Sequence, residues 1–573
     1  MNVLKGIPAA KGIAIGPGFL YQPSRLIPSR QSIRAVDEEI NHLYDALNLA
    51  EKELKVVYQN ALNSVGQEAA EIFNAHLMML KDPDLLESVE QTIRTEQINA
   101  DAAFYEAAET YAEMMQALSD EYLQARAADI RDVASRVIRI LGGEATQDTT
   151  LSSPSIIIAD ELAPSDTIKF DRDTTLGFFT AQGGTTSHTA ILSRALGIPA
   201  VVGAGRLPDS LSDTTNLILD GDHGKLIVDP DESTLAAYQQ SQQIQYEKLE
   251  QERQTSKKPA ITLDGKQVEV VANIGNLEDA QNAIKNGAEG VGLFRTEFSY
   301  LEQPSLPDEE ALVNVYKDIL QAFGELPVVV RTLDIGGDKE IPHLKLPAET
   351  NPFLGHRGIR LCLSRPDLFK PQLRAILRAG VDSNLCIMFP MIATVDEVRQ
   401  GRTVLNACMA ELESEKIAHN SNPQIGIMIE VPSAVICADQ LAQEVDFFSI
   451  GTNDLTQYTM AVDRTNANVT YLVSALQPAV LRLIKQVIDH GHKAGIWVGM
   501  CGEMAGEPLA IPILLGFGLD EFSMNPPAIP QAKAIIRRWD TEDAHSMAEQ
   551  ALLCQTPEEV ENLVSNWPKD SEK

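Results

Sequence analysis

The hydrophobic and polar positions of the first 141 residues predict two kinds of structure. Residues 1–22 alternate glycine with short apolar runs such as Gly12-Ile-Ala-Ile-Gly16, which predicts one or two short strands. Between Val36 and about Leu141, glycine and proline are nearly absent, and Ala, Leu, Ile and Met recur at helical spacing. We therefore predict a helical bundle in this second segment.

Strand-like runs return after residue 150. Four such runs are Ser155–Ala159, Thr175–Phe179, Ile198–Val202 and Leu217–Leu219. Short helical patterns separate the runs, so this stretch is predicted to form a compact α/β segment that ends near Pro230. The bundle is therefore inserted between the first strands and the rest of this segment. Residues 231–258 are rich in Gln and Glu and have no broad apolar face, which is typical of a helix that connects domains.

The remaining residues alternate apolar, β-rich runs with helical patterns. Eight candidate strands begin near Val268, Gly290, Val328, Leu385, Ile425, Phe447, Trp497 and Glu521. Eight strands separated by helices over this length indicate a (β/α)8 TIM barrel. The predicted fold class is thus multidomain α/β: an α/β domain of residues 1–22 and 142–230, a helical insert of 23–141, a linker helix of 231–258 and a barrel of 259–573.

The charge balance limits the possible partners. The chain has 47 Lys and Arg against 81 Asp and Glu, a formal net charge of −34, which argues against binding to nucleic acid or to an anionic membrane. Residues 36–140 hold 21 acidic and 8 basic residues. This surface would suit a partner with a basic patch, although the charge would equally serve to keep the helices solvated.

The absence of targeting signals and the pattern of cysteines indicate the cellular compartment. The first residues contain no apolar core of a signal peptide, and no uncharged apolar run is long enough for a transmembrane helix. The six cysteines form no C-x-x-C pair. We therefore expect reduced thiols and a cytoplasmic protein without membrane insertion.

Polar residues gather where the predicted barrel strands end, the place where barrels carry their working residues. Each alone could be an ion-pair or packing residue, but their joint placement favours a ligand site: Arg295, Arg331, Glu430, Asn453, Asp454 and Cys501. Arginines bind phosphate and carboxylate oxygens, and two carboxylates suit Mg2+. Arg464 would supply a third cation, and the Cys501 thiol a proton donor or nucleophile. The ligand class is a small phosphorylated and carboxylated metabolite.

A second candidate site surrounds His188. A Gly183-Gly184 turn follows the run that ends at Thr180, and Thr186 or Ser187 is placed to cap a helix. His188 then falls in the first helical turn, where backbone N–H groups and the helix dipole favour an anion. A transient phosphohistidine needs this environment, and a structural histidine is the alternative.

Four motifs carry a family resemblance. Gly183–Leu192 resembles the phosphohistidine signature of the phosphoenolpyruvate-utilising enzymes, and Asp446–Tyr458 resembles their second signature. Phe73–Asp82 and Ala127–Asp132 narrow the resemblance to the Enzyme I family of the bacterial sugar phosphotransferase system. It extends over essentially the whole chain, with the motifs in the same order.

The resemblance implies a two-step phosphoryl transfer. Phosphoenolpyruvate would bind in the barrel mouth with Mg2+ on Glu430 and Asp454. Nε2 of His188 would attack the phosphorus, and Cys501 would protonate the enolate to release pyruvate. The phosphoryl group would then pass to a histidine of the small phosphocarrier protein HPr. The residues that would bind the substrate are Arg295, Arg331, Asn453, Asp454 and Arg464.

The resemblance also assigns supporting roles. Thr167 would orient the imidazole, Arg357 would support the substrate site, and the barrel would form a homodimer. His188 would swing between barrel and bundle with the linker helix as a hinge arm. The predicted carrier-binding residues on the bundle are Glu68, Glu71, His76, Met78, Asp82 and Asp84.

Two departures and two alternatives accompany this interpretation. Many relatives have Arg where Thr185 stands and an aromatic residue where His356 stands, which affects carrier preference or substrate affinity. A pyruvate phosphate dikinase or phosphoenolpyruvate synthase would need an ATP-grasp domain, for which the helical insert is too short, and no Gly-rich ATP cradle is present. A catalytically silent regulator would have lost site residues that this chain retains.

Overall fold

A computed structural model gives the structure of the chain. It describes all residues except 23–25, 66, 118–120, 144–150, 152, 185–186, 208–214, 302–304, 337–343, 345–346, 348, 465 and 569–573. The side chains of residues 60, 62–65, 67–71, 121–125, 301, 467–468 and 470 also lie outside the description. The chain divides into two compact units, 1–247 and 248–573, and each is treated by itself. The division into three domains that the sequence predicts stays a prediction.

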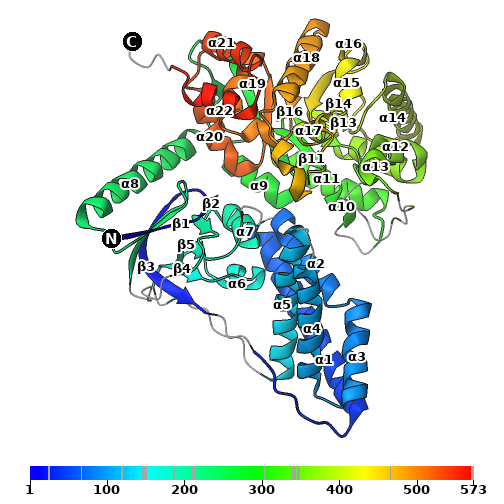
Figure 1. The fold of residues 1–573 in the computed structure, drawn as a ribbon. Helices are drawn as coiled ribbons and strands as arrows, with labels where there is room; N and C mark the ends of the chain where they lie inside the picture. The colour runs from blue at the N-terminus through cyan, green and yellow to red at the C-terminus, as the bar shows by residue number, and fades with distance from the viewer. Residues whose placement is uncertain are drawn as a thin grey trace. The chain divides into compact units, whose positions relative to one another are not determined.

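The first unit contains a mixed sheet whose strand order is β1-β8-β7-β3-β4-β5-β6-β2 (Figure 1). Strands β3 to β6 run parallel, and the flanking strands are antiparallel. The N-terminal 22 residues form three strands, one more than the pattern predicts. The strands are β1 Asn2–Lys5, β2 Ile7–Ala10, β3 Ile13–Tyr21, β4 Ser155–Ala159, β5 Thr175–Thr180, β6 Ala200–Val202, β7 Asn216–Asp220 and β8 Lys225–Val228.

Two short helices accompany this sheet, α6 Pro164–Lys169 and α7 His188–Leu196. Apolar side chains from both faces of the sheet are buried, among them Ile157 and Phe178 on one side and Ile156 and Phe179 on the other. This alternation is the period-two pattern of strands covered on both faces.

The predicted bundle is the insert between β3 and β4. Figure 1 shows its helices packed alongside one another. Alanine and leucine positions at helical spacing form its core, for example Leu43, Leu47 and Leu54 of the first helix. The helices are α1 Val36–Val65, α2 Gln67–Met79, α3 Pro83–Glu96, α4 Ala100–Gln116 and α5 Glu121–Leu141.

Helix α8, Glu232–Thr255, spans the boundary between the two units. Its first half is tied to the sheet by polar contacts: Tyr238 donates to Asp220 at 2.9 Å, and Gln242 donates to the carbonyl of Ile13 at 2.8 Å. In the part of the chain that the structure describes, no helix is both long and apolar enough to cross a membrane.

The second unit confirms the barrel. Among the described residues, eight parallel strands close on themselves through the β10–β11 pair, and the short strand β9 Ala260–Ile261 joins β10 antiparallel. All eight begin within one residue of the positions that the sequence predicts. They are β10 Gln267–Ile274, β11 Val291–Arg295, β12 Val328–Arg331, β13 Leu385–Phe389, β14 Gln424–Ile429, β15 Phe447–Ile450, β16 Trp497–Met500 and β17 Glu521–Met524.

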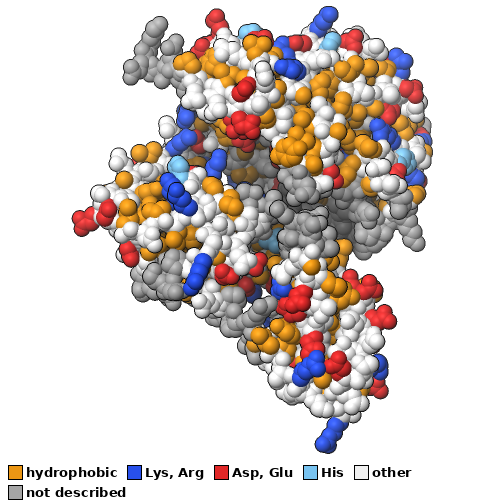
Figure 2. Space-filling model, in the orientation of Figure 1, with side chains coloured by type: hydrophobic (Ala, Val, Ile, Leu, Met, Phe, Trp, Pro, Cys, Tyr) orange, Lys and Arg blue, Asp and Glu red, His pale blue; other side chains and the backbone are white. Residues whose placement is uncertain are grey.

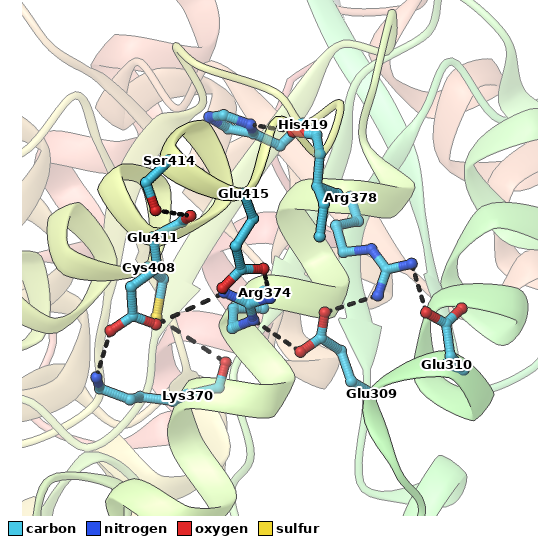
Figure 3. Close-up of polar contacts among 11 residues, drawn as sticks. Glu309, Glu310, Lys370, Arg374, Arg378, Cys408, Glu411, Ser414, Glu415 and His419 are labelled. Atoms are coloured by element: carbon cyan, nitrogen blue, oxygen red, sulfur yellow. Dashed lines mark hydrogen bonds and ion pairs between the residues drawn. The ribbon is translucent and has the colours of Figure 1, made fainter.

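Helices cover the outside of the barrel (Figure 1). The main ones between strands are α9 Leu277–Lys285, α11 Glu309–Phe323, α13 Pro366–Ala379, α14 Val395–Glu415, α18 Pro478–Ala494 and α19 Ile511–Phe517. Short helices lie near the strand ends or after the last strand: α10 Phe298–Leu301, α12 Ile359–Ser364, α15 Pro432–Ile436, α16 Ala438–Leu441, α17 Thr452–Met460, α20 Ile529–Ile536, α21 Thr541–Ala551 and α22 Pro557–Ser565. Figure 3 shows ion pairs that link α11, α13 and α14 on this outer surface.

Candidate active site

The carboxyl ends of the barrel strands bring together most of the predicted substrate residues. Arg295 ends β11, Arg331 ends β12, and the two are paired in register. Glu430 directly follows β14, Asp454 lies in the first turn of α17 after β15, and Cys501 directly follows β16. Because parallel strands of a barrel end on the same face, their side chains share one mouth.

Arg331 is buried between two carboxylates. Its Nη2 pairs with Oε1 of Glu297, and its Nη1 lies 3.2 Å from Oδ2 of Asp334. Burial opposes the charged guanidinium, but these carboxylates raise the pKa of Arg331, so the cation is retained. Among the described residues, Nε of Arg331 has no hydrogen-bond partner. A buried donor of this kind suits an anionic ligand.

Arg357 lies beside Asp334, the carboxylate that also pairs with Arg331. Its contacts fit the role predicted for it next to the substrate site. Its Nη2 donates to both oxygens of Asp334 at 3.2 and 3.1 Å, and its Nη1 donates to the Tyr458 hydroxyl at 3.4 Å. Nη1 also lies 3.5 Å from Oδ1 of Asp454. Asp334 therefore pairs with both Arg331 and Arg357. Arg357 in turn contacts Asp454, a predicted metal ligand.

Glu430 and Asp454 fit a divalent cation. Oε1 of Glu430 accepts the N–H of Met391 at 2.6 Å, and Oδ1 of Asp454 is buried without a hydrogen-bond donor among the described residues. Burial, and then the neighbouring Asp454 charge, raises the pKa of Glu430. A cation would relieve this repulsion and bind Oδ1 of Asp454, which has an ion-pair contact with Arg357 but accepts no hydrogen bond from the described residues.

The described part of the chain contains no group of three or more His, Cys, Asp or Glu side chains able to hold a metal. Two carboxylates alone are nevertheless the usual protein share of a magnesium site, because Mg2+ takes its other ligands from substrate oxygens and water. The donor set therefore suits Mg2+ better than a metal that needs a full protein cage.

Cys501 is buried at the end of β16, and its Sγ lies 3.8 Å from the carbonyl oxygen of Ile450. Burial raises the pKa of Cys501 to about 11. The thiol is therefore protonated at neutral pH, which suits a proton donor and not a resting thiolate nucleophile. Of the two roles that the sequence left open, the structure favours the acid.

Two of the remaining predicted substrate residues have well-defined neighbours. Asn453 exchanges hydrogen bonds with Glu503: its Nδ2 donates to the carboxylate at 3.3 Å, and its Oδ1 accepts the N–H of Glu503 at 3.1 Å. Arg464 follows α17, and its backbone N–H donates to Gln457 at 3.2 Å. The side chains of Asn453, Arg464 and Arg295 are all half-buried.

The second candidate site forms as the sequence predicts. Ser187 is the N-cap of α7, and its hydroxyl accepts the N–H of Ala190 at 3.4 Å. His188 is thus the first helical residue, beside free N–H groups of the first turn. Gly183 has a φ of +105°, a left-handed conformation that favours glycine in the preceding turn. Thr185 and Thr186 lie outside the described residues.

His188 contacts a carboxylate of the helical insert. Its Nδ1 lies 3.3 Å from Oδ1 of Asp129 in α5, and its side chain is 18% exposed. Burial lowers the pKa of His188, so the imidazole is neutral at neutral pH. Thr167, which the resemblance places against the imidazole, instead donates its hydroxyl to the carbonyl of Ala163 at 3.1 Å.

The predicted carrier-binding residues are only partly on the surface. Met78 is 65% exposed, and Asp82 and Asp84 are exposed, with Asp82 also capping α3. The structure does not support the prediction that His76 contacts the carrier. Its side chain packs between Phe73 and Asp129 and is fully buried, so it does not face a docked carrier. The side chains of Glu68 and Glu71 lie outside the description. Figure 2 shows acidic side chains gathered over the bundle.

Three carboxylates of the two sites received no role from the sequence. Glu297 and Asp334 follow strand ends beside predicted residues, and Asp129 lies inside a motif that carries the resemblance. Their positions beside predicted site residues could have marked them as candidates. The sequence could not assign their roles, because the partner of each depends on strand register and helix packing. His356, a departure from the family pattern, hydrogen-bonds Ser364 at 2.9 Å outside this network.

Comparisons with known proteins agree with the geometry. Residues 249–541 match the family model of the PEP-binding domain of PEP-utilising enzymes, 5–126 the N-terminal domain and 151–224 the mobile domain. The chain is 46% identical to the phosphoenolpyruvate-protein phosphotransferase of Geobacillus stearothermophilus and 44% identical to that of Bacillus subtilis, with 98% of each chain covered. It is 43% identical to that of Staphylococcus carnosus, with 99% of each chain covered.

Proposed function

The chain belongs to the phosphoenolpyruvate-utilising enzyme family, and from this we propose that it is a phosphoenolpyruvate–protein phosphotransferase. It transfers the phosphoryl group of phosphoenolpyruvate to His188, releases pyruvate, and passes the group to a histidine of the phosphocarrier HPr. This is the first step of sugar uptake by the bacterial phosphotransferase system. The observation that carries the proposal is the barrel mouth, where buried arginines and two carboxylates converge.

The substrate is held by charge. Arg331 and Arg295, with Arg464, bind the phosphate and carboxylate of phosphoenolpyruvate, and Asn453 lies beside them. The orphaned Nε of Arg331 supports this role, because substrate oxygens would satisfy it. Arg357 holds Asp454 in place through the 3.5 Å contact between Nη1 and Oδ1.

Glu430 and Asp454 would hold Mg2+, which supplies charge neutralisation on the transferred phosphoryl oxygens when bound. The carboxylates are kept apart from water by burial and fixed by Met391 and Arg357. Fixed charges of this kind need no rearrangement at the moment of transfer.

Phosphoryl transfer needs one bond to form and one to break. Nε2 of His188 forms a bond to phosphorus, and the bond from phosphorus to the enol oxygen breaks with its electron pair on that oxygen. Cys501 then gives its proton to C3 of the enolate, which yields pyruvate. The raised pKa of Cys501 supports this role, because the thiol carries its proton throughout the neutral range.

The carrier docks on the bundle. Met78, Asp82 and Asp84 offer an exposed apolar contact flanked by carboxylates, which suits a small protein with a basic patch. Glu68 and Glu71 belong to the proposed surface on the sequence resemblance, while His76 is excluded by its burial.

The proposal includes a homodimer formed through residues 259–573 and a cytoplasmic location. All six cysteines are free thiols, which is the state expected in a reducing compartment. Sedimentation of the full chain against that of residues 1–247 would test the dimer.

The decisive experiment incubates the protein with Mg2+ and phosphoenolpyruvate labelled on phosphorus. We expect an acid-labile, base-stable label on the wild type and none on His188→Ala. Ser193→Ala, on the same helix and buried away from solvent, serves as the matched control and should keep the label. Labelling of His188→Ala, or labelling of His188 by ATP alone, would refute the proposal.

A further inference from the structure

A buried carboxylate of the helical insert contacts the proposed phosphoryl acceptor. Oδ1 of Asp129 lies 3.3 Å from Nδ1 of His188 and 3.2 Å from Nε2 of His76. Both Asp129 and His76 are 0% exposed. The contact joins α5 of the bundle to α7 of the α/β segment, two elements of the same compact unit.

Asp129 is itself fixed in place. Nη1 of Arg126 donates to its other oxygen, Oδ2, at 2.9 Å. His76 supports the first oxygen and packs edge-on against Phe73, with ring centroids 5.8 Å apart. Burial raises the pKa of Asp129, but His76, His188 and Arg126 outweigh it, so the group remains an anion.

The contact selects one tautomer of the neutral His188 ring. With the proton on Nδ1, the positive end of that N–H lies beside the carboxylate charge, which is favourable, and Nε2 keeps its lone pair. With the proton on Nε2, the lone pair of Nδ1 would face the carboxylate oxygen at 3.3 Å, which is repulsive. The carboxylate charge beside one ring nitrogen thus decides the chemistry of the other.

We propose that Asp129 is a positioning residue for phosphoryl transfer, which holds the proton of His188 on Nδ1 and leaves Nε2 as the nucleophile. This inference rests on the proposed function and adds to it a group from the helical insert. Its role complements the one that the resemblance gives to Thr167, whose hydroxyl donates to the carbonyl of Ala163.

The bonds balance without a further reactant. When Nε2 bonds to phosphorus, the bond from phosphorus to the donor atom breaks, and that atom leaves with the electron pair. Nδ1 keeps its proton, the phosphorylated ring carries positive charge, and the Asp129 anion offsets it. When a nitrogen of the carrier histidine takes the group, the bond between Nε2 and phosphorus breaks, and the ring returns to the neutral Nδ1–H form.

The charged and titratable groups that face His188 are Asp129, Asp132, His76 and Arg126. Asp132 lies one turn further along α5, 3.7 Å from Nδ1 of His76, and accepts the N–H of Ser165 at 3.3 Å. Asp132 acts on His188 through its charge, so Asp132→Asn removes the same charge from the same helix and leaves the 3.3 Å contact between Asp129 and His188 in place. It is the matched control.

The first test needs no variant. In the full chain with 15N-labelled histidine, the ring nitrogen shifts of His188, assigned by their loss in His188→Gln, report the tautomer directly. We expect Nδ1 to be protonated and Nε2 to carry the lone pair at neutral pH. A dominant Nε2–H form in the unphosphorylated wild type would overturn the inference, whatever the behaviour of the variants.

The second test measures Asp129→Asn. Because Arg126 donates to Oδ2, the amide oxygen would turn toward Arg126 and the NH2 group toward Nδ1 of His188, which favours the Nε2–H tautomer. We expect this tautomer in the spectrum and a transfer rate from phosphorylated HPr to His188 about 10–100-fold below wild type. Asp132→Asn should keep the wild-type tautomer and a rate close to wild type.

Equal tautomers and rates in Asp129→Asn, Asp132→Asn and the wild type would overturn the inference. So would loss of rate with an unchanged tautomer, because that result is a structural effect. Asp129→Glu, which restores the anion, should recover part of the rate. The outcomes separate the inference from the proposed function, since the wild type would still be labelled by phosphoenolpyruvate if Asp129 had no role.

Discussion

The barrel mouth and the His188 site, which the proposed function assigns to the same phosphoryl group, are built differently. In the mouth, Arg331 and Arg357 share the Asp334 carboxylate, and all three residues come from the end of β12 and the segment that follows it in one closed barrel. At His188, Nδ1 lies 3.3 Å from the carboxylate of Asp129, on a helix of the insert. The mouth is a dense buried network, whereas the His188 site depends on few contacts between two segments.

The difference follows from what each site has to do. A substrate site that stabilises charge gains from groups that do not move, because fixed dipoles and ions need no reorganisation. A histidine that serves a donor and an acceptor on different parts of the chain has to be released, so a few polar contacts suit it better than a packed network. Each prediction below tests one side of this contrast, from the largest effect to the smallest.

Cys501→Ala should separate the two sites most clearly. Loss of the proton donor should slow pyruvate formation by about 10²–10⁴-fold, the usual effect of a general acid. Transfer from phosphorylated HPr to His188 should stay near normal, because the barrel does not take part in it. Since the pKa of Cys501 is about 11, the wild-type rate should not fall through thiol deprotonation until the pH approaches that value. A parallel drop in both half-reactions would make Cys501 structural.

Arg357→Met should destabilise the second unit strongly. It leaves Asp334 and Asp454 short of a buried cation, and breaking such a pair costs about 3–5 kcal/mol of the free energy of unfolding. Tryptophan fluorescence during urea unfolding isolates this unit, because Trp497, Trp539 and Trp567 all lie in residues 248–573. An effect below about 1 kcal/mol would show that the network is not buried in solution.

Glu521→Gln should stabilise the barrel in a pH-dependent way. Glu521 begins β17, and its Oε1 is buried without a hydrogen-bond partner among the described residues, in the space left by Gly292 and Gly499. Burial raises its pKa to about 8 from 4.5, so the wild type loses stability as the pH rises between these values. The variant should gain on the order of 3 kcal/mol at pH 8 and nothing near pH 4.5. A gain independent of pH would contradict this assignment.

Arg374→Met should have the smallest effect. Figure 3 shows Arg374 of α13 between Glu309 of α11 and Glu415 of α14, each 2.7 Å away. The Arg374 side chain is 14% exposed and its carboxylate partners are 23% and 46% exposed. Screening by solvent at the carboxylates limits these pairs to about 1 kcal/mol, less than the buried pairs of Arg357. The same fluorescence measurement, repeated at high salt, should show the small loss disappear. A cost equal to that of Arg357→Met would remove the distinction between buried and outer ion pairs.

Much of the fold could be predicted from local pattern. The barrel strands are short, apolar and separated by amphipathic helices, so their starts could be located closely, for example at Leu385 and Trp497. The strands of the first 22 residues were harder to predict, because β2 is a four-residue strand at the edge of the described sheet, contains Pro8 and pairs with β6. Edge strands carry a weaker alternation than buried ones.

In the candidate sites, too, some features could be predicted from the local sequence and others could not. Ser187 as the cap before His188 was predictable, since capping depends on residues three apart in the chain. The burial of His76 was not, because its position on an acidic helix gives no sign of the α5 carboxylate against which it packs. A helical pattern indicates which residues share a face, but not what covers that face.

By itself the sequence determined the order of the elements, the barrel, the family and the residue types at the strand ends. These follow from periodicity and from motifs, which depend on residues close together in the chain. Only the tertiary structure decided the partners: that Asp334 binds both Arg331 and Arg357, and that Asp129 meets His188. The reason is physical, because pairing between distant residues depends on strand register and helix packing, and a shift of one residue would exchange one partner for another.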